Sequence, residues 1–197
     1  ERFKERFKTN YKGPILDWPR YNRVNEDQEH IDEIRANYMA LLSLCDELLG
    51  KLLDYFDEND LWKDTALIVG TDHGFLLGEH DWWAKNRMPL YEEISHIPLF
   101  FYHPEYMTLG GERRSSLTQT IDLMPTFLDL YDAPIPDEVQ GYSLIPILKK
   151  DTTQRSAGMF GYWGGGINIV DGQYTYFCYP KDMLNQDLYQ YTLMPTH

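Results

Sequence analysis

The chain has 197 residues, of which 43% are hydrophobic and 15% aromatic, and it carries a formal net charge of −13. This length and apolar content predict one folded domain, or slightly more, with a real core, and exclude a disordered protein. The acidic excess argues against nucleic acid or an anionic membrane as a partner, because affinity for phosphate groups comes from clustered Lys and Arg.

No membrane span is expected from the sequence. The longest apolar runs, 66–69 and 97–102, are far shorter than the roughly 20 residues that a spanning helix needs. The first residues, ERFKERFKTNYKGP, are charged and show no apolar core of a secretory signal, which leaves the compartment open between cytoplasm and periplasm. Two cysteines provide neither a disulfide framework nor zinc-ligand spacing.

The first predicted element is a long amphipathic helix from Ile31 to Phe56, in which apolar residues recur at spacings of three and four. Cys45 lies on its apolar face and is expected in the core. After a turn, the continuous apolar run Thr65–Val69 ends at Gly70 and is typical of a strand covered on both faces. A helix followed by such a strand predicts a parallel α/β sheet.

The strand signal returns at Ile97–Tyr102. Farther along, Thr120–Leu130 is interpreted as another helix, in which Pro125 marks either a kink or a late start. These elements predict the α/β fold class, with a partial sheet and flanking helices over residues 1–150.

From about Pro134 onward, proline and glycine interrupt an alternating aromatic pattern. The pair Asp171-Gly172 separates the strand-like run Ile167–Val170 from a second run over Tyr174–Tyr179, which predicts a hairpin. We therefore expect a small antiparallel β appendage over residues 151–197.

The loop after the first predicted strand, TDHGFLLGEHDWWAK, concentrates the residues that could do chemistry. Ligand sites of open α/β sheets lie beyond the carboxyl ends of the strands, which is where Asp72 and His73 stand. A carboxylate oxygen and a neutral imidazole nitrogen can bind a divalent cation if other ligands converge, and Gly74 would let the backbone turn sharply below them. By itself, the Asp-His-Gly triplet is more typical of a turn cap beside a surface imidazole.

His80 and Lys85 place a second imidazole and an ammonium on the same loop. An ammonium beside a metal suits an anionic substrate, because fixed cations stabilise the charge that develops on its oxygens. Alone, Lys85 would be an ordinary solvated residue, and Trp82 and Trp83 would be packing for the loop.

The stretch TDHGFLLGEHDWWAKN, followed by MPLYEEISHIPLFFYHP, resembles the C-terminal metal and substrate segment of the sulfatases, within the alkaline-phosphatase-like superfamily. ANYMALLSLCDELLGKLLDYF before it, and TIDLMPTFLDL and QGYSLIPIL after it, resemble family segments in the family's order. The resemblance covers residues 31–148, and the tail GGGINIVDGQYTYF is similar to the family's small C-terminal sheet. It implies a partial alkaline-phosphatase-like sheet and a sulfate ester as the substrate.

The resemblance implies that Asp72 and His73 supply half of a divalent metal site, usually calcium in sulfatases. It also implies that Lys85 contacts the sulfate oxygens and that His80 lines the same pocket. Many sulfatases have Asn at the position of His73, and an imidazole also admits manganese or zinc. The Asp-His form is shared with phosphonate and phosphodiester hydrolases of the superfamily, so the metal and the choice between sulfate and phosphate esters stay open.

The family's nucleophile motif, Cys or Ser followed by x-Pro-x-Arg, is absent from these 197 residues. In true sulfatases its cysteine matures to formylglycine. The nearest match, CYPKD at 178–182, has Asp in place of Arg, so Cys178 is interpreted as a strand residue. We therefore expect the C-terminal portion of a sulfatase, inactive by itself, with a sheet edge that could pair with another copy. A non-catalytic binding module is the alternative from another class of function.

Overall fold

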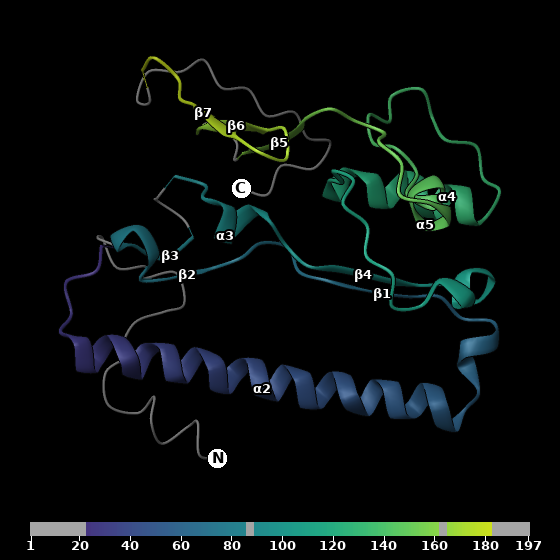
Figure 1. Cartoon of the computed structure of the whole chain (residues 1–197), viewed down its shortest axis with the longest axis horizontal. Coiled ribbons are helices and arrows are strands. Elements are labelled where there is room, and N and C mark those ends of the chain that lie inside the picture. Colours follow the sequence, from purple (N-terminus) through teal and green to yellow (C-terminus); the bar gives the residue numbers. More distant parts are fainter. Residues whose placement is uncertain (1–22, 86–88, 162–164, 183–197) are drawn as a thin grey trace, which may run out of the picture.

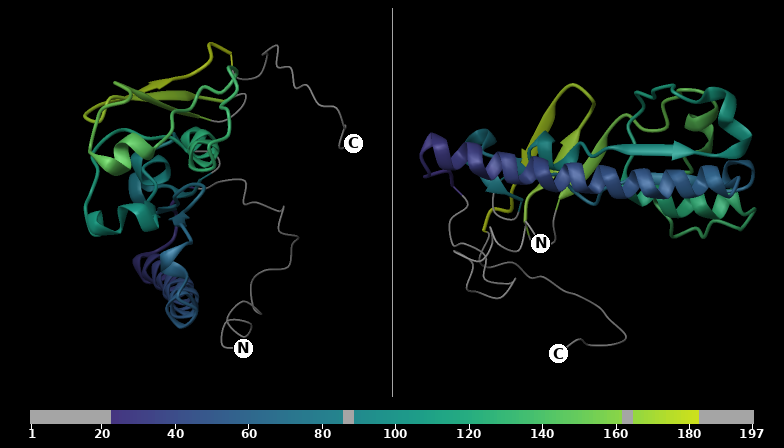
Figure 2. Two further views of the ribbon diagram at one scale, coloured as in Figure 1. Left: turned by 90° about the vertical axis from the view of Figure 1, so that its right-hand side faces the viewer. Right: turned by 90° about the horizontal axis from the view of Figure 1, so that it is seen from below.

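The computed structural model describes residues 23–85, 89–161 and 165–182. In this part of the chain one long helix, α2, lies along one side of a short strand pair, β1 and β4 (Figure 1). Two short helices, α4 and α5, and the sheet β5–β7 lie on the other side of that pair, and the left-hand view of Figure 2 shows the same order. The charged N-terminal residues discussed above lie outside the described ranges.

Helix α2 spans Gln28–Glu58, which confirms the predicted helix and extends it at both ends. It begins at Asp27, whose side chain accepts a hydrogen bond from the backbone N–H of His30 at 3.0 Å, as an N-cap does. Phe56 is the one residue of α2 that is buried against the described residues. The prediction that Cys45 lies in the core is wrong for this structure, because nothing described covers the middle of the apolar face and Cys45 is exposed.

Strands β1 (Leu67–Gly70) and β4 (Leu99–Tyr102) pair antiparallel, with Leu67 opposite Tyr102. Both predicted strands are confirmed, but the expected parallel arrangement is wrong for this pair. A parallel partner requires a crossover to the opposite end of the strand. Here the chain stays at the carboxyl end of β1 and re-enters the sheet from that end. The first three residues of β1 are half-buried rather than fully covered.

A second strand pair and a short helix lie beyond that end of β1. β2 (Leu76–Leu77) pairs with β3 (Trp83–Ala84), and the turn between them contains the 3-10 segment Glu79–Asp81. Helix α3 (Glu92–Ser95) packs on this hairpin through Ile94, which meets the fully buried Leu76. This small core holds the loop that carries the candidate site.

The chain then forms the helical side of the molecule. The 3-10 segments η1 (Leu61–Lys63) and η3 (Pro104–Leu109) flank the β1–β4 pair, and α5 spans Ile145–Lys149. A 3-10 turn over Thr120–Asp122 leads into α4 (Leu123–Leu130), whose first turn contains Pro125. The late-start reading of Pro125 is therefore the correct one, since a proline is tolerated in a first helical turn.

A buried ion pair ties this helical side to the segment that leads into the C-terminal sheet. Asp122 and Arg155 have side chains only 1% and 7% exposed, and the guanidinium of Arg155 donates to the Asp122 carboxylate. The same carboxylate accepts the backbone N–H groups of Gln119 at 2.7 Å and Tyr142 at 2.9 Å. These bonds compensate the cost of burying a charge.

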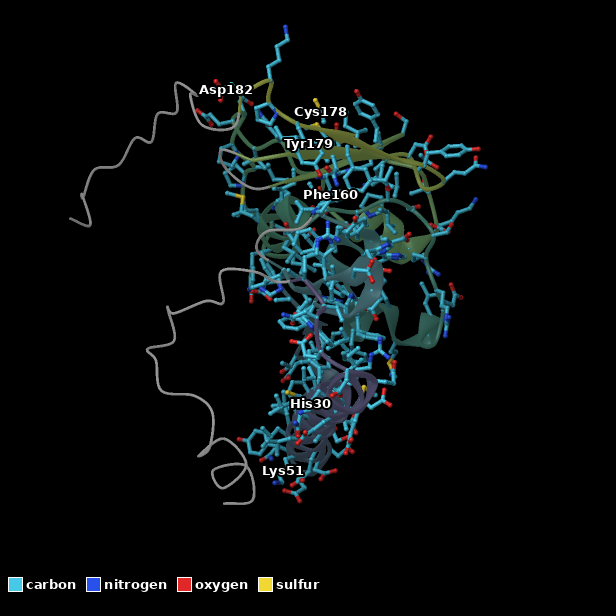
Figure 3. All side chains as sticks on the ribbon, turned by 90° about the vertical axis from the view of Figure 1, so that its left-hand side faces the viewer. His30, Lys51, Phe160, Cys178, Tyr179 and Asp182 are labelled. Atoms are coloured by element: carbon cyan, nitrogen blue, oxygen red, sulfur yellow. The ribbon has the colours of Figure 1, made fainter. Side chains whose placement is uncertain are left out.

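The C-terminal sheet has the order β5 (Gly158–Gly161), β6 (Ile167–Val170), β7 (Thr175–Cys178), and all its pairs are antiparallel. The predicted hairpin is confirmed: Asp171 accepts the N–H groups of two turn residues, and Gly172 has a φ of 92°. Cys178 is a strand residue, as predicted, and Figure 3 shows it on this sheet, at the opposite end of the molecule from Lys51 on α2. A domain boundary near residue 150 stays a prediction.

No helix in the described part of the chain combines the length and the apolar character needed to cross a membrane.

Candidate active site

Asp72 and His73 follow β1 at its carboxyl end, where the sequence placed them. The Asp72 carboxylate accepts the backbone N–H of His73 at 3.0 Å, and its other oxygen lies 3.1 Å from His73 Nε2. The Asp72 side chain is 81% exposed, whereas that of His73 is 33% exposed. The Asp72 carboxylate is therefore open to an incoming ion, whereas the His73 ring is partly covered by the protein.

A contact of Nδ1 orients the ring of His73. Its Nδ1 lies 2.9 Å from the carbonyl oxygen of Gly74, which can only accept a hydrogen bond. We assign a proton to Nδ1, so Nε2 is the nitrogen that would bind a metal. A hydrogen bond of this kind is how proteins orient an imidazole that binds a metal through its other nitrogen.

Lys85 completes the cluster. Its Nζ contacts Nε2 of His73 directly, so the ammonium and the two donors meet at one place.

Partial burial alone would raise the pKa of the Asp72 carboxyl. Electrostatic interaction with His73, backbone N–H groups and the Lys85 ammonium outweigh it, and together they hold that pKa below its ordinary value of 3.8. The carboxylate thus stays available as an anionic ligand.

The donor set fits half of a divalent cation site. Two ligands bound at right angles, a nitrogen at about 2.1 Å and an oxygen at about 2.4 Å from a metal, lie roughly 3.2 Å apart. The distance of 3.1 Å between Asp72 Oδ2 and His73 Nε2 matches that arrangement. Within the described ranges no group of three or more His, Cys, Asp or Glu side chains could hold a metal. Further ligands would have to come from elsewhere.

The hairpin that carries Lys85 has an unusual backbone. His80, Asp81 and Ala84 have φ values of 55°, 61° and 71°, and Gly78 has 103°. Left-handed backbone costs roughly 1–2 kcal/mol for a residue other than glycine. Strained residues of this kind cluster at functional sites, where the surrounding structure holds them in place.

His80 makes its contacts with α3 and with the residue that precedes this helix. Its Nε2 lies 3.2 Å from a carboxylate oxygen of Glu93, and its ring stacks on Tyr91 with centroids 3.8 Å apart and planes 14° apart. The structure therefore brings Asp72, His73 and Lys85 together, while His80 contacts α3 instead. That His80 lines the same pocket stays a prediction.

Glu93 and Tyr91 were not singled out as site residues from the sequence. Their contacts with His80 join the turn of the hairpin to residues 11 and 13 positions farther along the chain. No local periodicity reports such a contact, because it depends on how the hairpin folds onto α3.

Gly74 has a different role from the expected one. Its φ is not in the left-handed region, so a sharp glycine turn is the wrong explanation. Its N–H donates to the carbonyl of Ile94 at 2.7 Å, and a Cβ at this position would lie 1.8 Å from the carbonyl oxygen of Glu93. Glycine is required here because α3 approaches too closely for a side chain.

Two family models match the chain. The model described as Sulfatase matches residues 2–133, and the model described as N-sulphoglucosamine sulphohydrolase, C-terminal, matches residues 78–191. The second range contains the turn and the second strand of the candidate hairpin, Lys85 and the small antiparallel sheet, whereas Asp72 and His73 lie in the first range alone.

Curated relatives agree with the family models. The chain is 35% identical to N-acetylglucosamine-6-O-sulfatase of Bacteroides thetaiotaomicron, over 58% of this chain and 20% of that protein. It is 34% identical to human arylsulfatase K, over 61% and 22% of the two chains. It is 33% identical to the multifunctional alkaline phosphatase superfamily protein PehA of Trinickia caryophylli, over 62% and 23%. The chain thus spans about a fifth of the length of these relatives.

Solved structures show the same fold. A structure determined in complex with its substrate, D-glucosamine-2-N,6-O-disulfate, aligns with a TM-score of 0.58 and 27% identity, over 74% of this chain and 31% of that one. A Bacteroides thetaiotaomicron protein assigned as a sulfatase aligns with a TM-score of 0.67 and 19% identity, over 85% and 43%. These alignments confirm the predicted α/β fold class.

Proposed function

Since this chain belongs to the sulfatase family, we propose that it forms the C-terminal part of an enzyme that hydrolyses a sulfate ester with the help of a divalent metal. The observation that carries the proposal is the meeting of Asp72, His73 and Lys85 beyond the end of β1. Two metal-type donors and one ammonium at a single point suit the binding of an anionic group.

Asp72 and His73 are the residues that would hold the metal, which, when bound, polarises the sulfate and stabilises negative charge on its oxygens. The Nδ1–H bond of His73 to Gly74 orients the ring for this role. Calcium is the expected ion, with manganese or zinc as alternatives because one donor is an imidazole.

Lys85 would contact the sulfate oxygens. Its ammonium is partly buried next to the metal donors, where a fixed charge stabilises a developing anion more strongly than it does in water. His80 is proposed as a member of the same site, through the positioning role argued in the next subsection.

The nucleophile would come from the family's N-terminal portion, where a formylglycine is expected. The 197 residues contain no Cys- or Ser-x-Pro-x-Arg motif. We therefore propose that this chain does not turn over a sulfate ester by itself, and that the metal site needs ligands from the same missing portion.

A sulfated amino sugar is the first substrate to test. One relative is named as an N-acetylglucosamine-6-O-sulfatase, and one structural neighbour was solved with D-glucosamine-2-N,6-O-disulfate as its substrate. The similarity to PehA makes a phosphodiester the matched alternative substrate.

The test is a substrate panel on the full-length protein. Glucosamine 6-sulfate, an aryl sulfate and an aryl phosphodiester are offered with calcium, manganese or zinc. We expect hydrolysis of a sulfate ester that is abolished by chelator, and a loss of about 10²–10³-fold in kcat for Asp72→Ala and for Lys85→Ala. Lys51→Ala is the control, since Lys51 pairs with Glu47 on the exposed surface of α2.

Other outcomes would contradict the proposal in different ways. Turnover of the phosphodiester alone would replace the sulfatase assignment by a phosphodiesterase. No turnover of any ester, together with no calorimetric response to metal or inorganic sulfate, would favour a non-catalytic binding module.

A further inference from the structure

At the tip of the β2–β3 hairpin, the side chain of His80 contacts α3 and the residue that precedes it. Its imidazole stacks on the ring of Tyr91 and meets the carboxylate of Glu93. Both partners lie at the start of α3, Tyr91 as the residue that precedes the helix and Glu93 in its first turn. The His80 imidazole is thus held on its face by the Tyr91 ring and at its edge by the Glu93 carboxylate.

Two residues of the C-terminal sheet contact Tyr91 and the residue before it. The ring of Phe177, in β7, meets Tyr91 edge-on, with centroids 6.0 Å apart. Asn168, in β6, is 2% exposed and donates from Nδ2 to the carbonyl of Leu90 at 2.9 Å. A buried amide is retained where its hydrogen bond is made, so this bond fixes the backbone that leads into Tyr91.

The hairpin needs such support because its own ladder is very short. It has two residue pairs, Leu76 with Ala84 and Leu77 with Trp83. A two-stranded hairpin is marginally stable by itself even when it is longer. Its backbone also adopts left-handed conformations that residues other than glycine disfavour.

Lys85 follows β3 directly, so the position of the hairpin sets the position of its ammonium. Ala84, the last residue of β3, has a φ of 71° and is buried, which leaves little freedom between the tip and Lys85. A shift of the tip would therefore move the ammonium away from His73 and from any anion held there.

We propose that His80 is a positioning residue: clamped by Tyr91 and Glu93, with the C-terminal sheet behind Tyr91, it holds the hairpin so that Lys85 meets the substrate anion. This inference rests on the proposed role of Lys85 in ester hydrolysis. It assigns a function to the stacked ring and to the small sheet.

A double-mutant cycle on the full-length protein tests the proposal. His80→Ala should lower kcat by about 10- to 100-fold with KM changed less than three-fold, because small misplacements of a catalytic group reduce rates on this scale. In a Lys85→Ala background the same substitution should change kcat by less than about two-fold, since its effect passes through Lys85. An equal loss in both backgrounds would overturn the proposal and make His80 a direct contact of the substrate.

Conservative variants distinguish loss of the His80–Tyr91 ring stack from a general loss of folding. Tyr91→Phe keeps the ring and should retain kcat within about three-fold, whereas Tyr91→Leu should lose as much as His80→Ala. If Tyr91→Leu does not fold, His80→Asn replaces it, since Asn tolerates a positive φ and lacks the ring. Full activity of His80→Asn would contradict the proposal.

His96→Ala is the matched control. His96 also pairs with a glutamate of α3, Glu92 at 2.8 Å, but its side chain is 78% exposed, compared with 42% for His80. Its removal should leave kcat within about two-fold. A loss equal to that of His80→Ala would show that any His–Glu pair on α3 has this effect, and would overturn the specific role.

The outcome also distinguishes this inference from the proposed function. An active enzyme that loses activity with Lys85→Ala but not with His80→Ala would contradict the positioning role alone. An enzyme indifferent to Lys85→Ala, or inactive on every ester, would contradict the proposed function on which it rests.

Discussion

Gly74 lies between the two metal-type donors and the helix behind them. Its backbone N–H binds the carbonyl of Ile94, and its Cα faces the backbone of Glu93 with no room for a side chain. The same stretch of α3 carries the glutamate that holds His80. One close backbone contact therefore sets the distance between the Asp72–His73 pair and the elements that support Lys85.

We expect Gly74→Ala to destabilise the protein by about 2–4 kcal/mol, because a rigid backbone carbonyl must move to admit the new Cβ. The free energy of unfolding is measured by urea denaturation. Gly50→Ala is the control: it lies inside α2 with nothing within 4 Å of the added Cβ, and should stabilise by up to about 1 kcal/mol. Equal effects of the two substitutions would contradict the close-contact explanation.

At the scale of elements, Asp151 joins the segment after α5 to the loop before α4. Its carboxylate accepts the hydroxyls of Ser115 at 2.7 Å and Ser116 at 2.5 Å, and also the backbone N–H groups of both serines. The hydroxyls of Ser116 and Ser115, followed by their N–H groups, outweigh partial burial and hold the pKa of Asp151 well below its ordinary value of 3.8. Two segments about 35 residues apart are thereby tied by one ionised group.

This depressed pKa predicts a dependence of stability on pH. A group whose pKa is lower in the folded state stabilises fully above its unfolded pKa, and that stabilisation is lost as the pH falls through the folded pKa. The contribution of Asp151 should therefore be complete above about pH 4–5 and decline in more acidic solution. Asp151→Asn should flatten the fall in unfolding free energy between pH 6 and pH 2.5, measured by urea denaturation.

A control from the surface of α2 completes this experiment. Asp46→Asn changes the same charge where the side chain faces solvent. It should leave the slope of stability against pH closer to that of the parent protein than Asp151→Asn does. Identical slopes for the two variants would argue against the serine contacts as the cause.

At the scale of the whole molecule, the described residues leave much apolar surface uncovered. The sheet β1–β4 has two strands only, and Phe100 in β4 is 67% exposed. Along α2, Leu48 and Leu52 are 54% and 43% exposed. Monomeric proteins rarely show apolar surface this extensive, and an open sheet edge is a template for pairing with another chain.

We expect the 197-residue chain, prepared alone, to self-associate through the edge of the β1–β4 sheet. Phe100→Lys should shift the population toward monomer in sedimentation velocity, because a charge on an edge strand opposes pairing. Met39→Lys, on the exposed surface of α2, is the matched control. A monomeric parent chain, or dissociation by Met39→Lys in place of Phe100→Lys, would contradict pairing through the sheet edge.

The sequence by itself determined the elements and the chemistry of the candidate loop. The spacing of apolar residues located α2, the apolar runs located β1 and β4, and Asp171-Gly172 located the β6–β7 hairpin. These features are local, since helical periodicity, strand composition and turn residues act over a few neighbouring positions. The choice of Asp72, His73 and Lys85 as candidates came from the same local pattern and the family resemblance.

Only the tertiary structure decided how these pieces meet. It made β1 and β4 antiparallel, left Cys45 exposed, explained Gly74 by close packing and turned His80 toward Tyr91 and Glu93. Each of these outcomes depends on contacts between residues far apart in the chain, whose energies no short stretch of sequence contains. The physical reason is that packing and pairing are chosen by the whole set of neighbours, while helices, strands and turns are favoured by each segment alone.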